Sequence, residues 1–63
     1  MYRYYFIAQD RKTSVEFIRT GHVAMESALH SYHDHIARAA TNDITGFNLW
    51  IAKGQAKLYF REV

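Results

Sequence analysis

The chain has 63 residues, no cysteine and a net charge of +2, and these properties exclude several classes of protein. A chain of this length forms a single domain, residues 1–63, that buries roughly 60% of the surface exposed by its unfolded form. Disulfide bonds and thiolate zinc sites are excluded, so stability must come from one hydrophobic core or from association, which leaves a homodimer open. The aromatic content of 16% argues against a disordered chain.

No segment resembles a targeting or membrane-spanning sequence. The first residues lack the apolar run and cleavage site of a signal peptide, and no apolar stretch is long enough to span a membrane. We therefore expect a cytoplasmic protein without a membrane partner. The mild positive charge does not by itself indicate a dedicated nucleic-acid binder.

The N-terminal part predicts a β-hairpin. Residues 2–8 are rich in aromatic and β-branched side chains, and residues 13–19 alternate between apolar and polar ones. The polar residues between them are typical of a turn. A turn centred on residues 10–11 would pair Phe6 with Val15 on the core face of the hairpin.

Residues 21–40 show a helical repeat of apolar side chains. The repeat consists of Met25, Ala28, Leu29, Tyr32, Ile36 and Ala39. We expect this stripe to pack on a sheet, with Thr20 as a candidate N-cap. Val23 falls on the polar side of the helix, which would instead place the helix start a few residues later. Gly46 follows the end of the pattern.

A second hairpin is predicted at the C-terminus. Residues 47–52 and 56–61 flank Lys53-Gly54 at two-residue hairpin spacing. The implied register pairs Leu49 with Leu58 on the apolar face. The sequence therefore predicts an α+β domain of order β-β-α-β-β, in which two hairpins form an antiparallel sheet and one amphipathic helix packs on one face.

Candidate catalytic and metal-binding groups all lie on the predicted helix. Glu26, His30 and His33 or Asp34 are spaced to line one side of it, but one helix supplies too few ligands for zinc or nickel. Ser27, His30, Ser31 and Asp34 also lie there, without the pocket or oxyanion donors that a nucleophile needs. We therefore predict no metal, no cofactor and no enzymatic activity.

The sheet face turned away from the helix is the candidate binding surface. The predicted registers place on it Arg3, Tyr5, Ile7, Glu16, Ile18, Asn48, Trp50, Lys57, Tyr59 and Arg61. The candidate binding residues among them are aromatic or basic: Arg3, Tyr5, Trp50, Lys57, Tyr59 and Arg61. Exposed Trp, Tyr and Arg are typical of protein-interface hot spots and of surfaces that stack on single-stranded nucleic acid. The alternative is that these side chains only pair across strands and stabilise the sheet.

One stretch of the C-terminal hairpin resembles a known family. Leu49-Trp50-Ile51-Ala52, followed by Lys53-Gly54 and the return strand Lys57 to Tyr59, is similar to a hairpin of small phage-encoded type I-F anti-CRISPR inhibitors. The resemblance covers about the last third of the chain. It implies a non-enzymatic protein that docks on a CRISPR surveillance complex and obstructs DNA recognition.

Two functions follow as hypotheses. The first is a small binding module, encoded by a phage or another mobile element, that blocks a host protein or nucleoprotein complex in the host cytoplasm. The second is a direct nucleic-acid binder that uses the aromatic and basic sheet face. Salt separates them, because phosphate binding falls steeply with ionic strength and an aromatic protein interface does not.

Overall fold

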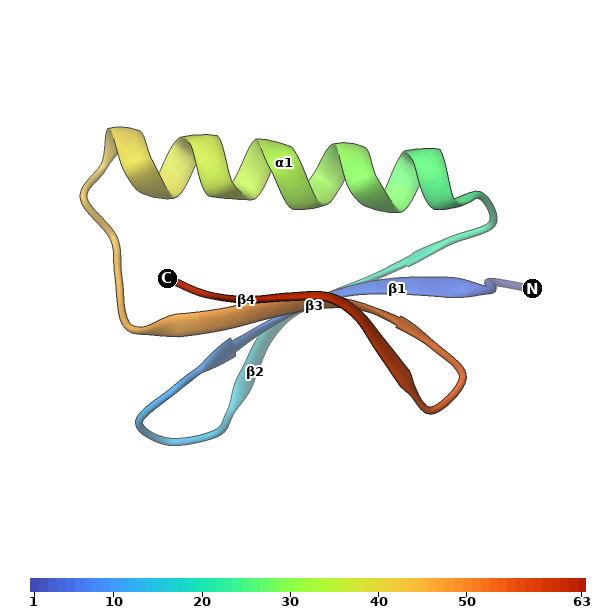
Figure 1. The fold of residues 1–63 in the computed structure, drawn as a ribbon, viewed down its shortest axis with the longest axis horizontal. Coiled ribbons are helices and arrows are strands. Elements are labelled where there is room, and N and C mark those ends of the chain that lie inside the picture. Colours follow the sequence, from blue (N-terminus) through green and yellow to red (C-terminus); the bar gives the residue numbers. More distant parts are fainter.

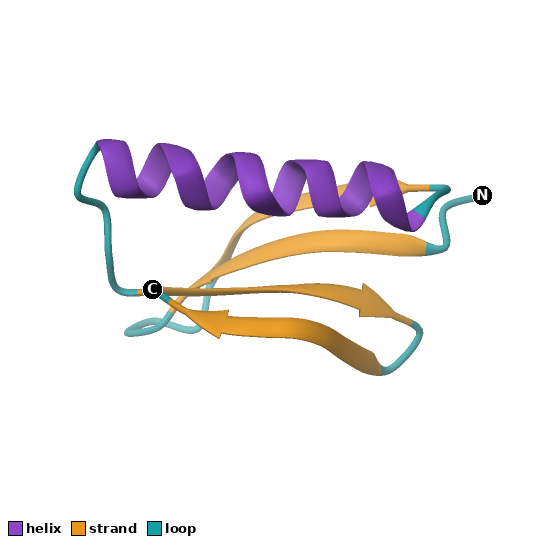
Figure 2. Ribbon diagram, turned by 45° about the horizontal axis from the view of Figure 1, so that its top comes forward, coloured by secondary structure: helices purple, strands orange, loops and turns teal.

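The computed structural model describes all 63 residues and has the predicted β-β-α-β-β order. The elements are β1 (Tyr4–Asp10), β2 (Glu16–His22), α1 (Met25–Thr41), β3 (Phe47–Lys53) and β4 (Ala56–Glu62). The strands form one antiparallel sheet in the order β2-β1-β3-β4, and α1 lies across one of its faces (Figures 1 and 2). The predicted fold is therefore confirmed.

The two hairpins join through their first strands. β1 pairs with β3, from Tyr5 opposite Ala52 to Asp10 opposite Phe47, which leaves β2 and β4 at the edges of the sheet. The strands at the centre carry the most buried side chains because they are paired on both sides and are covered by α1. α1 is neither long nor apolar enough to cross a membrane.

The core lies between α1 and the sheet. Its buried members are Phe6, Ala8, Ala28, Tyr32, Ala39, Phe47, Leu49 and Ile51. The predicted helical stripe is confirmed: Ala28, Tyr32 and Ala39 are buried, and Met25, Leu29 and Ile36 pack at the margin of the core. Ala28 and Ala39 are small, and Tyr32 between them packs its ring against Phe6 of β1, with ring centroids 6.4 Å apart.

The helix begins later than residue 21. Thr20 pairs with Phe6 inside β2, so its prediction as the N-cap is wrong. Ala24 is the N-cap and makes no side-chain cap hydrogen bond. The His22 ring instead ties the end of β2 to the first turn of α1, with Nδ1 2.8 Å from the Ser27 hydroxyl and Nε2 2.8 Å from the Thr20 hydroxyl.

The first hairpin has a longer loop than predicted. Phe6 lies opposite Thr20 and not opposite Val15, so the predicted register is wrong. The Asp10 carboxylate accepts hydrogen bonds from the backbone N–H groups of Lys12 and Thr13 at 2.8 and 3.1 Å. These two bonds lower the pKa of Asp10 and stabilise a wide loop in place of a tight turn.

The second hairpin turns one residue later than predicted. Lys53 pairs with Ala56 around Gly54 and Gln55, which moves Leu58 from the predicted partner Leu49 to Ile51. Gly54 has φ +60°, a conformation that glycine adopts without strain. The partner of Leu58 changes by two residues, which is the period of a strand. The side chains next to the turn therefore stay on the faces predicted for them.

A β-bulge changes the second half of β4. Tyr59 has φ +56°, and beyond it Leu49 lies opposite Arg61, one position out of step with the pairing next to the turn. One extra residue reverses the direction of every later side chain. Tyr59 contacts Tyr32 of α1, with ring centroids 6.2 Å apart, whereas Phe60 stacks on Trp50 at 6.0 Å on the opposite face.

Candidate functional site

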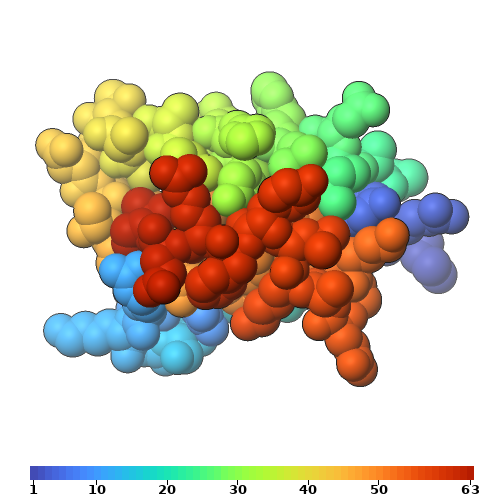
Figure 3. Space-filling view, viewed as in Figure 1, coloured from blue at the N-terminus to red at the C-terminus, as the bar shows by residue number.

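The candidate site is the sheet face turned away from α1, here called the outer face. Both hairpin ends, the β1–β2 loop and the β3–β4 turn, bend away from the helix and project from the opposite side of the sheet (Figure 1). The space-filling view shows the notch between these two ends (Figure 3). The outer face holds a cleft of about 270 Å³.

Three cross-strand rows build the outer face. The middle row runs from Arg19 through Ile7 to Trp50, on which Phe60 stacks. The row nearer the β3–β4 turn consists of Gly21, Tyr5, Ala52 and Lys57. The row nearer the β1–β2 loop consists of Glu16, Gln9, Asn48 and Glu62. An apolar centre is thus bordered by polar and charged side chains.

The floor of the cleft is apolar and buried by its own neighbours. Ile7 is 2% and Trp50 4% exposed, although no second layer covers this side of the sheet. The Lys57 ammonium lies 4.3 Å from the centre of the Trp50 ring, and Phe60 stacks beside it. The Lys57 stem and the Phe60 ring therefore shield the indole from water.

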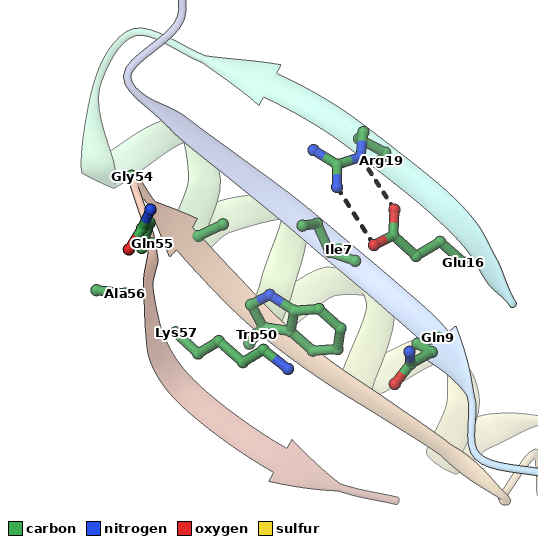
Figure 4. A pocket seen from close by; sticks show the side chains of 10 residues that line it. Ile7, Gln9, Glu16, Arg19, Trp50, Gly54, Gln55, Ala56 and Lys57 are labelled. Carbon is green, nitrogen blue, oxygen red and sulfur yellow. Dashed lines mark hydrogen bonds and ion pairs between the residues drawn. The ribbon is translucent and has the colours of Figure 1, made fainter. Parts of the chain in front are cut away.

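The opposite wall holds a second cation on an aromatic ring. Arg19 donates two hydrogen bonds to the Glu16 carboxylate, at 3.0 and 3.2 Å, and its guanidinium lies 5.5 Å from the centre of the Tyr5 ring. The Glu16 hydrogen bonds raise the pKa of Arg19. Figure 4 shows this pair and Lys57 on opposite sides of Ile7 and Trp50.

The structure keeps part of the predicted binding set together. Tyr5, Trp50 and Lys57 lie on the outer face as predicted. The prediction that Trp50 is exposed is wrong, because Lys57 and Phe60 cover it. Arg3 is exposed just before β1, where its backbone N–H donates to the His22 carbonyl at 3.0 Å.

Three other placements on the outer face are corrected. Tyr59, at the bulge, and Arg61, beyond it, lie on the helix side of the sheet, with Tyr59 against Tyr32 and Arg61 opposite Leu49. Ile18 also packs against the core, opposite Ala8. The physical reason is the same in both edge strands, since an extra residue breaks the simple alternation of faces.

Two members of the site, Arg19 and Phe60, were missed by sequence reasoning, whereas Glu16 was placed on this face. Arg19 and Glu16 are three residues apart, so strict alternation would place them on opposite faces. β2 pairs Glu16 with Gln9 and Ile18 with Ala8, and the extra residue Phe17 brings both charges to one face. Phe60 reaches the outer face only through the bulge at Tyr59. No local sequence pattern marked either bulge.

The histidine groups do not converge on a cleft. No three His, Cys, Asp or Glu side chains lie close enough to hold a metal ion. The Ser27–His22–Thr20 hydrogen bonds join β2 to α1 at the surface. Neither the outer-face cleft nor a second cleft, of about 200 Å³ between the end of α1 and Arg61, is lined by a serine or a histidine.

His35 is the histidine that is built into the core margin. Its ring lies 5.2 Å from Phe47, 5.8 Å from Phe6 and 6.2 Å from Phe17, measured between ring centroids. Burial lowers the pKa of His35, the positive charge of Arg38 lowers it further, and Asp34 opposes the shift. The folded state therefore holds the neutral imidazole in preference to the cation.

We expect acid to destabilise the protein through His35. The unfolded chain binds this proton at a higher pH than the folded chain, so the free energy of unfolding should fall as pH drops from about 7.5 to about 5. Urea titrations of the parent and His35→Leu at several pH values measure this. The variant should show a shallower pH dependence, and an unchanged slope would contradict the assignment.

The outer-face cleft thus offers an apolar floor between two fixed cations and one carboxylate. Such a site can bind a ligand that has an apolar group next to a charged one. Comparison with known proteins assigns no relative, because no family model, no curated protein and no solved structure matches the chain.

Proposed function

We propose that the chain is a non-enzymatic binding module that docks on a larger protein through its outer face. The observation that carries this proposal is the concave cleft, which has Ile7 and Trp50 as its floor and no second layer of structure over it. The single helix covers one face of the sheet, and the other face stays available to a partner.

A protein partner is favoured over nucleic acid. Two of the aromatic and basic residues needed for phosphate contact and stacking, Tyr59 and Arg61, lie on the other side of the sheet. Trp50 does not present a free ring for base stacking because Lys57 and Phe60 cover it.

The particular case that we propose is an inhibitor of a host nucleoprotein complex, of the anti-CRISPR kind, acting in the cytoplasm of a bacterial host. The stretch that resembles such inhibitors contributes to both faces of β3. Leu49 and Ile51 are in the core, whereas Trp50 and Ala52 line the cleft. Lack of cysteine suits a reducing compartment. A DNA-binding assay with a purified type I-F surveillance complex tests this case directly, and undiminished DNA binding at saturating inhibitor would exclude it.

The broader proposal is tested by filling the cleft. Ala52 lies on the floor between Tyr5 and Lys57, so Ala52→Tyr adds a ring where a partner would sit. Ala37→Tyr makes the same change at an exposed position of α1 and is the matched control. Both variants are first compared with the parent by circular dichroism and thermal melting, and Lys57→Glu replaces Ala52→Tyr if the latter fails to fold.

The three chains are then used as affinity baits in a lysate of cells that express the protein. We expect the parent and Ala37→Tyr to retain the same protein and Ala52→Tyr to lose it. Equal retention by all three would contradict the outer face as the binding surface. If the baits retain only nucleic acid, and lose it at moderate salt, direct nucleic-acid binding would be favoured over protein binding.

A further inference from the structure

The outer-face cleft has an excess of positive charge. Among the residues that line it, Arg19 and Lys57 are cations and Glu16 is the one carboxylate. Glu16 is engaged by Arg19 at 3.0 Å, whereas Lys57 has no carboxylate partner within ion-pair distance. The ammonium of Lys57 is therefore the charge in the cleft that remains to be neutralised.

Lys57 is also held in place. Its ammonium lies 4.3 Å from the Trp50 ring centre and 5.9 Å from that of Phe60. A cation positioned over an aromatic face loses less side-chain freedom when it binds an anion than a free surface lysine does. The position beside Lys57 and Phe60, whose ring is 49% exposed, therefore suits a carboxylate adjoining an apolar group.

A second copy of the chain does not fit this cleft. Two concave faces cannot pack on each other, and the exposed side of α1 offers Glu26, His30, His33 and Asp34, with no large apolar side chain. Both edge strands carry bulges, at Phe17 and Tyr59, which oppose pairing of one sheet with another. None of these three modes of self-association fills the cleft, so we assign the cleft to a convex segment of a different protein.

From this arrangement we infer that the outer face binds an acidic, amphipathic peptide segment along the cleft, in which an apolar side chain against the exposed Phe60 ring is followed by an Asp or Glu that pairs with Lys57. This inference rests on the proposed function and specifies the partner's chemistry. The apolar group supplies contact area, and the carboxylate fixes the direction of the segment.

A displayed library of random peptides tests the inference with the full chain as bait. Peptides that also bind Ala52→Tyr are removed before sequencing. We expect the remaining peptides to share an aromatic or aliphatic residue followed within about one helical turn by Asp or Glu. Enriched peptides without acidic residues, or no enrichment, would overturn it.

A charge swap on the selected peptide makes the test specific. Lys57→Glu should weaken binding at least about tenfold, and an acidic-to-lysine change in the peptide should restore affinity for that variant. Lys12→Glu, in the exposed β1–β2 loop, makes the same change in net charge and should have little effect. Fluorescence of Trp50, the one tryptophan, reports binding. Equal losses in both variants would overturn the inference.

The outcome also separates this inference from the proposed function. If Ala52→Tyr abolishes partner capture but the selected peptides lack acidic residues, the binding face stands and the partner's chemistry is wrong. If Ala52→Tyr captures the partner normally, both fail. A single-stranded oligonucleotide that quenches the fluorescence of Trp50, with an affinity that falls steeply with salt, would show that the ligand is nucleic acid and not a peptide.

Discussion

Replacing Trp50 with alanine is expected to lower the free energy of unfolding by about 3 to 5 kcal/mol, as large aromatic truncations in a core do. Trp50 is only 4% exposed although it lies on the outer face. The change removes the partner of the Phe60 ring and of the Lys57 ammonium at once. Urea unfolding followed by far-ultraviolet circular dichroism, which does not depend on the indole, measures the loss.

Tyr59→Ala is the control for this prediction. Tyr59 is 55% exposed and its ring lies tilted against Tyr32 of α1, so its removal should cost about 1 kcal/mol or less. A Trp50→Ala variant that is no less stable than Tyr59→Ala would show that the outer face does not bury the indole.

Leu49→Ala is expected to cost about 2 to 5 kcal/mol, because it leaves a cavity under the helix. Leu49 is fully buried on β3, with Ala8 beside it on β1. Ala8 is too small to fill the space that the leucine vacates. A thermal melt should show a large decrease in Tm, since a domain of this size has few kcal/mol to lose.

Leu29→Ala makes the same chemical change at the margin of the core. Leu29 is only half-buried, so its truncation should cost clearly less than that of Leu49. If Leu29→Ala were the more damaging of the two, the centre of the core would lie nearer the first half of α1 than the structure places it.

The elements of the fold were predictable because each has a local signal. The apolar repeat from Met25 to Ala39 predicts a helix, and the glycine at Gly54 marks a tight turn between two apolar runs. These signals depend on residues close together in the chain. They are sufficient for the number, type and order of the elements.

The registers were not predictable to the same degree. In the first hairpin, the hydrogen bonds that Asp10 accepts widen the loop and move Phe6 from Val15 to Thr20. In the second, the bulge at Tyr59 reverses the faces of the residues that follow. Both effects arise from backbone conformations that several residue types can adopt, so alternation of apolar and polar residues does not reveal them.

The candidate site was therefore predicted only in part. Tyr5 and Lys57 lie outside the irregular segments, and Trp50 lies on β3 opposite the bulge of β4, so all three lie where the alternation places them. Arg19 and Phe60 join the outer face through the bulges. The burial of Trp50 depends on both Lys57 and Phe60, and such a three-residue contact across a bulge has no signature in the sequence.

Amide chemical-shift mapping of the labelled chain, saturated with its captured partner, tests the binding face most directly. The outer-face account predicts the largest shifts at Ile7, Trp50 and Lys57, with the amides around His30 and His33 on the exposed side of α1 unchanged. Shifts confined to that side of α1, with the outer face unaffected, would contradict it.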